Sequence, residues 1–220
     1  MMDFLKKYAG NEQDRTVAFN GLTFLINSLT GIIQLVMGIY SYSPWYIVHS
    51  IYWLLMGLVK ALAIKDYKHA RAINDEAERY DFEFDVFKRG GWLICLLGVA
   101  YLGISLWMLL TGESRVHDDF RVVLAVAAFA FAKVGVGIYG VIANWHLQAP
   151  IISYFKRISL LNAMVSIVVT QSNLLALFDE PIAAVYHSAL LGMLVSELFL
   201  IVGLLMVMKK GSIPDTVDVQ

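Results

Sequence analysis

The sequence is poor in cysteine, proline and charge, and each shortage excludes a class of protein. Its 220 residues include one cysteine, Cys95, and four prolines. A lone cysteine excludes an internal disulfide, and we interpret Cys95 as a small buried apolar residue. Charged residues make up 16% of the chain, whereas a soluble domain carries about a quarter. The formal net charge of −1 offers no basic surface for a nucleic acid.

Motifs of enzymes and metal sites are also missing. The chain has no nucleophile–base motif, no glycine loop for a phosphate and no HExxH. His49 and His187 lie near acidic residues of expected external turns, Asp179 and Glu180, but without the spacing of metal ligands. The sequence therefore predicts no enzymatic activity, no cofactor and no metal site.

The apolar residues, by contrast, are plentiful and are grouped in long blocks. They make up 59% of the chain, and the mean hydropathy is +0.65. Blocks of roughly twenty residues match the length of helix that crosses about 30 Å of hydrocarbon. Inside a bilayer the backbone must satisfy its own hydrogen bonds, so each block is expected to be helical. The sequence predicts an all-α membrane protein with six transmembrane helices in one bundle, at residues 17–40, 46–64, 92–110, 122–143, 158–178 and 183–208.

The connectors between the blocks predict the orientation in the membrane. Basic residues gather at the N-terminus, between the second and third blocks, between the fourth and fifth, and after the sixth: Lys6, Lys7, Arg15, Lys65, Lys68, Arg71, Arg79, Lys88, Arg89, Lys156, Arg157, Lys209 and Lys210. The other connectors hold only Arg115 and Arg121, among acidic residues. The positive-inside rule therefore places both termini in the cytoplasm.

The predicted organisation has three parts. Residues 1–16 form a cytoplasmic N-terminal segment, residues 17–208 the six-helix domain, and residues 209–220 a cytoplasmic tail. A cytoplasmic helical connector spans residues 65–91 inside the domain. Its run HARAINDEAERY (69–80) has mixed charges at helical spacing and predicts one solvated helix, which the Gly90–Gly91 pair follows.

Two charges fall in the middle of expected membrane helices. Lys133 lies twelve residues past Arg121, about 18 Å along a helix, where a charge costs at least about 2.5–3.5 kcal/mol. Glu197 lies at a similar depth in the sixth block, so we expect the two to face each other in the bundle interior or to share a water-filled cavity. The pair is either a fixed clamp between helices or a titrating group on a transport path. Lys60, close to Lys65, is expected to extend to the cytoplasmic surface and to have no role.

Uncharged polar residues form two stripes at three- and four-residue steps, which places each stripe on one helix face. The first stripe comprises Asn20, Thr23, Asn27, Thr30 and Gln34, and the second comprises Ser159, Asn162, Ser166 and Thr170. The two stripes either line a hydrophilic path or only join helices by hydrogen bonds. The small residues Ser188, Gly192 and Ser196 favour close approach of the 183–208 helix to the 122–143 helix. The alternative is that these surfaces form the interface of a homodimer.

The sequence resembles two families. Over most of the chain, and chiefly in the runs AKVGVGIYGVIANWHLQAPIISYFKRISLLNAMVSIVVTQSNLLALF and FLINSLTGIIQLVMGIYSYSPW, it is similar to a family of uncharacterised bacterial six-span integral membrane proteins. This first resemblance implies a location in a bacterial cytoplasmic membrane. The runs YIVHSIYWLLMGLVKAL and KRISLLNAMVSIVVT more weakly resemble the transmembrane domain of cation diffusion facilitators. That resemblance implies a divalent metal held by paired His and Asp residues. Here His49 has no acidic partner on its helix and Asn162 stands where an aspartate is expected, so the metal site does not carry over.

These observations favour a transporter or channel-like protein for a small ion or solute. Its path would use the two polar stripes and the Lys133–Glu197 pair. The alternative is a non-transporting membrane protein that binds or regulates a partner through the 65–91 connector. The expected partners are the lipid bilayer, the solute and a second copy of the chain in a homodimer, with no nucleic acid.

Overall fold

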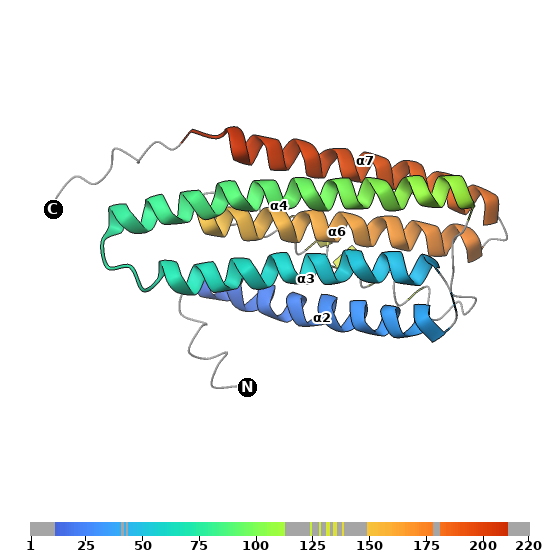
Figure 1. The fold of residues 1–220 in the computed structure, drawn as a ribbon, viewed down its shortest axis with the longest axis horizontal. Coiled ribbons are helices and arrows are strands. Elements are labelled where there is room, and N and C mark those ends of the chain that lie inside the picture. Colours follow the sequence, from blue (N-terminus) through green and yellow to red (C-terminus); the bar gives the residue numbers. More distant parts are fainter. Residues whose placement is uncertain are drawn as a thin grey trace.

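A computed structural model describes residues 12–40, 42, 44–112, 149–177 and 181–210, together with residues 124, 128, 131, 132, 134, 135 and 138. Within this part of the chain the structure consists of long helices and contains no strand, which confirms the all-helical class (Figure 1). The helices are α2 (Glu12–Tyr40), α3 (Pro44–Ala70), α4 (Glu76–Thr111), α6 (Pro150–Leu177) and α7 (Pro181–Met208).

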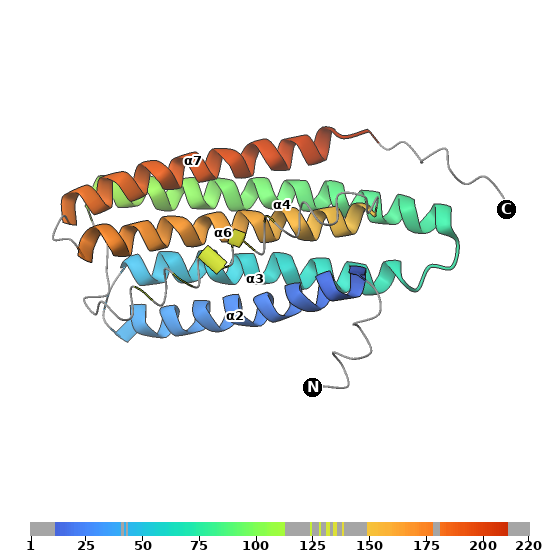
Figure 2. The same cartoon turned by 180° about the vertical axis from the view of Figure 1, so that it is seen from behind.

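The helices lie side by side with their axes nearly aligned (Figures 1 and 2). α6 occupies the centre and contacts α2, α3, α4 and α7, while the most extensive packing joins α4 to α7 and α2 to α3. Each helix runs antiparallel to the one before it, except that α4 and α6 run in the same direction (Figure 1). The transmembrane helix expected at residues 122–143 lies almost wholly outside the described residues and stays a prediction.

Large apolar side chains cover the outside of the bundle. Leu25 and Leu29 on α2 are each 60% exposed, and Leu205 on α7 is 64% exposed. A soluble bundle turns such residues inward and seldom exposes large apolar patches. Five helices of the described chain are also long and apolar enough to cross a membrane. The outer surface therefore suits contact with lipid.

The ends of the helices follow from a few residues. Prolines occupy the first positions of α3, α6 and α7, where the missing N–H would have no helical partner. Asp75 caps α4 by accepting a hydrogen bond from the Ala77 N–H. Gly112 ends the same helix with a φ of 66°, a left-handed conformation that glycine adopts without strain.

The expected single helix at residues 69–80 is wrong. α3 continues to Ala70, residues 71–75 make a turn, and α4 begins at Glu76. The charges at helical spacing belong to the ends of two long helices, and the Asp75 cap favours a new helix start over continuation. The 46–64 and 92–110 blocks are therefore the apolar portions of longer helices, and α6 likewise begins at Pro150, ahead of residue 158.

Glycines and a cysteine allow α4 and α7 to approach closely. A Cβ atom on Gly203 of α7 would lie 2.5 Å from Cys95 Sγ and 2.6 Å from the Gly91 carbonyl oxygen of α4. A Cβ atom on Gly90 would lie 2.6 Å from the ring of Tyr154 on α6. The Gly90–Gly91 pair thus lies inside α4 and serves helix packing, and does not end a connector as expected.

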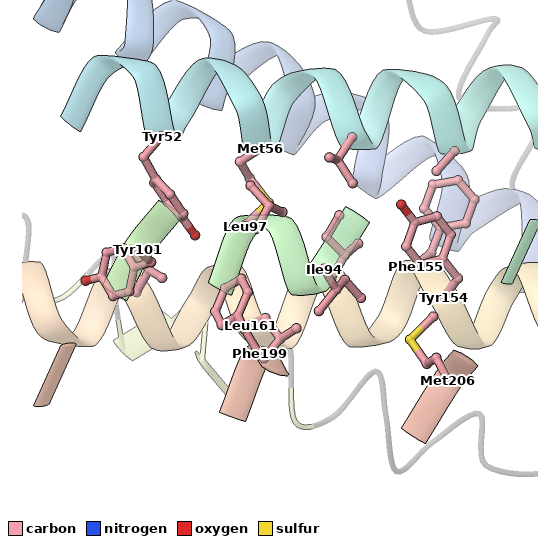
Figure 3. Packing of buried hydrophobic residues seen from close by; sticks show 14 of the residues in the cluster. Tyr52, Met56, Ile94, Leu97, Tyr101, Tyr154, Phe155, Leu161, Phe199 and Met206 are labelled. Atoms are coloured by element: carbon pink, nitrogen blue, oxygen red, sulfur yellow. The ribbon is translucent and has the colours of Figure 1, made fainter. Parts of the chain in front are cut away.

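The core between α3, α4, α6 and α7 is apolar along most of its length. Figure 3 shows Met56, Ile94, Leu97, Leu161 and Phe199 directed toward one another from these four helices. Burial of such side chains contributes little between helices in lipid, so dispersion contacts and close fit carry the packing.

We expect Gly203→Ala to destabilise the bundle, because its Cβ atom would meet α4 backbone. Overpacking of this kind costs about 1–3 kcal/mol in the free energy of unfolding. The measurement is unfolding of the purified chain in mixed micelles by added SDS. Gly103→Ala in α4 is the control, because no atom of the described residues lies within 4 Å of a Cβ there. Equal stability of the two variants would contradict the close α4–α7 packing.

Candidate functional site

The two predicted polar stripes lie on α2 and α6 and turn toward the bundle interior. Six of their residues are buried, namely Asn20, Thr23, Asn27, Asn162, Ser166 and Thr170, whereas Thr30, Gln34 and Ser159 are half-buried. The opposite face of α2 exposes leucines and isoleucines. The helix is therefore polar inside and apolar outside, as the three- and four-residue spacing predicts.

One hydrogen bond joins the two stripes directly. Ser159 Oγ on α6 donates to Asn20 Oδ1 on α2 over 2.7 Å. Asn20 Nδ2 in turn donates to the Thr16 carbonyl of its own helix over 2.9 Å. Because both polar ends of the Asn20 amide are engaged, the side chain is held in one orientation between the helices.

A lysine from α3 completes this arrangement. Lys60 is fully buried, at 0% exposure, and its Nζ donates to Thr23 Oγ1 over 2.8 Å. Thr23 Oγ1 donates to the Asn20 carbonyl over 3.1 Å. Lys60, Thr23, Asn20 and Ser159 thus form a connected set from three helices, which we call the Lys60 network.

The expectation that Lys60 extends to the surface is wrong. α3 continues ten residues past Lys60, to Ala70, so the lysine does not lie at a helix end. Met56, Ala63 and Tyr67 share its face at helical spacing and are also buried. That periodicity was available in the sequence and places Lys60 toward the interior.

Further along the bundle, several buried polar atoms have no hydrogen-bond partner within the described part of the chain. They include Asn27 Nδ2 on α2, Tyr52 Oη on α3, and Asn162 Oδ1 and Thr170 Oγ1 on α6. Leaving such an atom unpaired costs about 1–3 kcal/mol. These three helices therefore present free donors and acceptors to the same interior that holds the Lys60 network.

An anchor at one end of the bundle holds α2 against α3. Asp14 accepts hydrogen bonds from Tyr67 Oη over 2.7 Å and from Arg71 Nη2 over 2.9 Å. The Tyr67 ring also meets the Phe155 ring of α6 edge to face. Sequence reasoning missed this contact, since it assigned residue 14 to a cytoplasmic N-terminal segment ahead of the first helix and nothing local links it to residue 67.

The Lys133–Glu197 pair stays a prediction, because Lys133 lies outside the described residues. Glu197 lies on α7 with its side chain exposed. Gly192 and Ser196 on the same helix face α4. A Cβ atom on Gly192 would lie against the Ser105 side chain, and a Cβ atom on Gly98 would lie 3.2 Å from the Ser196 carbonyl oxygen. The small residues of α7 therefore pack against the helix that contains the 92–110 block, whereas we expected the 122–143 helix.

No group of three or more His, Cys, Asp or Glu side chains with the geometry of a metal site occurs among the described residues. His49 is buried on α3, and His187 is exposed on α7. Among the described residues, the polar groups between α2, α3 and α6 are mainly amides and hydroxyls, together with the ammonium group of Lys60. Such groups bind and orient small polar molecules or ions.

A double-mutant cycle tests the Lys60–Thr23 hydrogen bond. We expect Thr23→Val to lower the free energy of unfolding by about 1–3 kcal/mol, because the buried ammonium loses an acceptor. Lys60→Met removes the charge, so adding Thr23→Val to it should cost clearly less. SDS unfolding measures all four proteins, with Thr111→Val, an exposed threonine of α4, as control. Strictly additive effects would show that the two side chains do not interact.

Comparison with protein-family models and with curated proteins gives no match to this chain. The arguments about its function therefore rest on its residues alone, and the two resemblances noted from the sequence stay predictions.

Proposed function

We propose that this chain is a multi-pass membrane protein that passes a small ion or polar solute through its interior. The observation that carries the proposal is the buried polar region between α2, α3 and α6, inside a bundle whose outside is apolar. Interhelical hydrogen bonds alone account for the Lys60 network. Within the described part of the chain, they leave polar atoms of Asn27, Asn162 and Thr170 without a hydrogen-bond partner.

The chemistry of the region fits a solute that sheds its water. Asn27 Nδ2 offers a donor, Asn162 Oδ1 an acceptor and Thr170 Oγ1 either. A solute that moves along this region exchanges hydration for such groups, as ions do in membrane selectivity sites. Lys60 adds a fixed cationic group, which disfavours bare cations next to it.

The Lys133–Glu197 pair has a place in this proposal as the coupling element. A carboxylate and an ammonium that pair within the membrane respond to a proton or an ion by exchanging partners. Proton coupling through Glu197 follows from that chemistry.

The rival function, partner binding, is favoured by a separate observation. The first turns of α4 extend past the ends of α6 and α7 (Figures 1 and 2). They expose the acidic residues Glu76, Glu78 and Asp81. This projecting end offers a docking surface that needs no path through the bundle, so water access to the interior separates the two functions.

Cysteine labelling tests water access. In a Cys95→Ser background, we expect Asn27→Cys to react with a charged, membrane-impermeant methanethiosulfonate in vesicles, because its side chain lies among free polar groups. Leu29→Cys is the matched control, two residues away but on the lipid-facing side of α2. Labelling no faster at position 27 than at position 29 would indicate a dry bundle and favour the partner-binding function.

Flux through reconstituted vesicles tests the charge pair. We expect proton-coupled flux, read by an internal pH dye after an imposed potassium or chloride gradient, to fall at least about tenfold in Glu197→Gln, since one neutralised partner removes the exchangeable site. Glu78→Gln on the projecting end of α4 is the control for loss of a carboxylate. Unchanged flux in Glu197→Gln would remove this residue from the mechanism and leave the polar region to be judged by the labelling result.

A further inference from the structure

A second concentration of unsatisfied polar groups lies at the other side of α6, where it meets α4 and α7. The Arg157 guanidinium of α6 lies 4.8 Å from the centre of the Phe87 ring on α4. Lys209, which follows α7, places its Nζ 5.7 Å from the same ring. Phe87 itself is buried, so two cations from two helices converge on one aromatic ring.

The ring satisfies these cations only in part. A cation near an aromatic face gains on the order of 0.5–2 kcal/mol, which does not replace a hydrogen-bond acceptor. Arg157 Nη1 is buried and has no hydrogen-bond partner in the described chain. Among the described residues neither Arg157 nor Lys209 forms an ion pair, whereas Arg71, Arg79 and Arg89 each do. The described part of the chain therefore supplies no acceptor with negative charge at this site.

More positive charge and an aromatic ladder extend the site along α4. Lys88 Nζ lies 4.8 Å from the Phe84 ring, and Phe84 stacks on Phe87 with ring centres 6.1 Å apart. Lys210 adds a further exposed cation after α7. The patch thus attracts an anion more strongly than any one of its residues would.

The surface next to the patch is apolar and exposed. Along α7, Ile201, Leu205 and Met208 lead away from Lys209, with Met208 at 74% exposure. On α4, Trp92 lies five residues after Phe87 and is also exposed, as tryptophans at membrane interfaces are. A ligand that fits both features has an anionic head and long apolar chains.

We propose that Arg157, Lys209 and Lys88 bind the phosphodiester headgroup of an anionic phospholipid, whose acyl chains lie along the exposed side of α7. The half-buried Arg157 guanidinium donates to a phosphate oxygen, and the exposed Lys209 supplies a second charged donor. Both cations lie against the Phe87 ring. This site does not depend on the proposed transport, since a chain that conducts nothing would still bind the lipid.

Native mass spectrometry of the full chain in detergent tests this site, with dioleoyl phosphatidylglycerol and dioleoyl phosphatidylcholine as probes. We expect the anionic lipid to bind more tightly, and Arg157→Gln and Lys209→Gln each to weaken it about fivefold without altering phosphatidylcholine binding. Arg79→Gln removes the same charge where Glu76 pairs with it, and should bind like the unaltered chain.

Three outcomes would overturn the proposal. One is equal binding of the two lipids, and another is undiminished phosphatidylglycerol binding in both patch variants. The third is full displacement of the lipid by glycerol 3-phosphate at equal concentration, which would assign the site to free anions. If Arg157→Gln fails to fold, Lys209→Gln decides alone, because Lys209 is exposed and lies outside the helix.

Discussion

The structure depends on one constraint: in a bundle with an apolar outside, polar side chains must find partners within the protein. Most of the large apolar side chains exposed on α2 and α7 are leucine, isoleucine and methionine, although Glu197 and His187 are also exposed on α7. Amides, hydroxyls and Lys60 turn inward as a result, where each costs free energy unless it is hydrogen-bonded. In the Lys60 network, polar side chains of three helices satisfy this requirement by hydrogen bonds to one another. The nearby atoms of Asn27, Asn162 and Thr170 have no such partner among the described residues.

The two halves of the bundle meet the constraint differently. α4 and α7 approach closely through Gly91, Cys95 and Gly203, with Ser105 and Ser196 at the same contact. α2, α3 and α6 approach through hydrogen bonds, with the Asp14–Tyr67–Arg71 anchor at one end. The contact between α4 and α7 is closely packed, whereas α2, α3 and α6 present hydrogen-bonding groups to one another. A path for a polar solute is expected on the polar side for that reason.

Cations occupy two contrasting environments in this molecule. Lys60 lies fully inside and bonds to a hydroxyl, whereas Arg157 and Lys209 lie at the edge of the bundle against an aromatic ring. The first environment suits a fixed structural or selective charge. The second is the environment in which we propose that an anionic phospholipid binds.

The sequence by itself determined the helical class, the apolar outside and the inward direction of the two polar stripes. These follow from block length and from three- and four-residue spacing, which are properties of a single helix. Prolines at three helix starts belong to the same local level. Only the tertiary structure decided that Lys60 meets Thr23, that Asp14 meets Tyr67, and that Gly90 and Gly91 lie within a helix. The two contacts join residues that are distant in the chain, and all three features depend on the exact helix lengths and on the turn at 71–75, which no local pattern specifies.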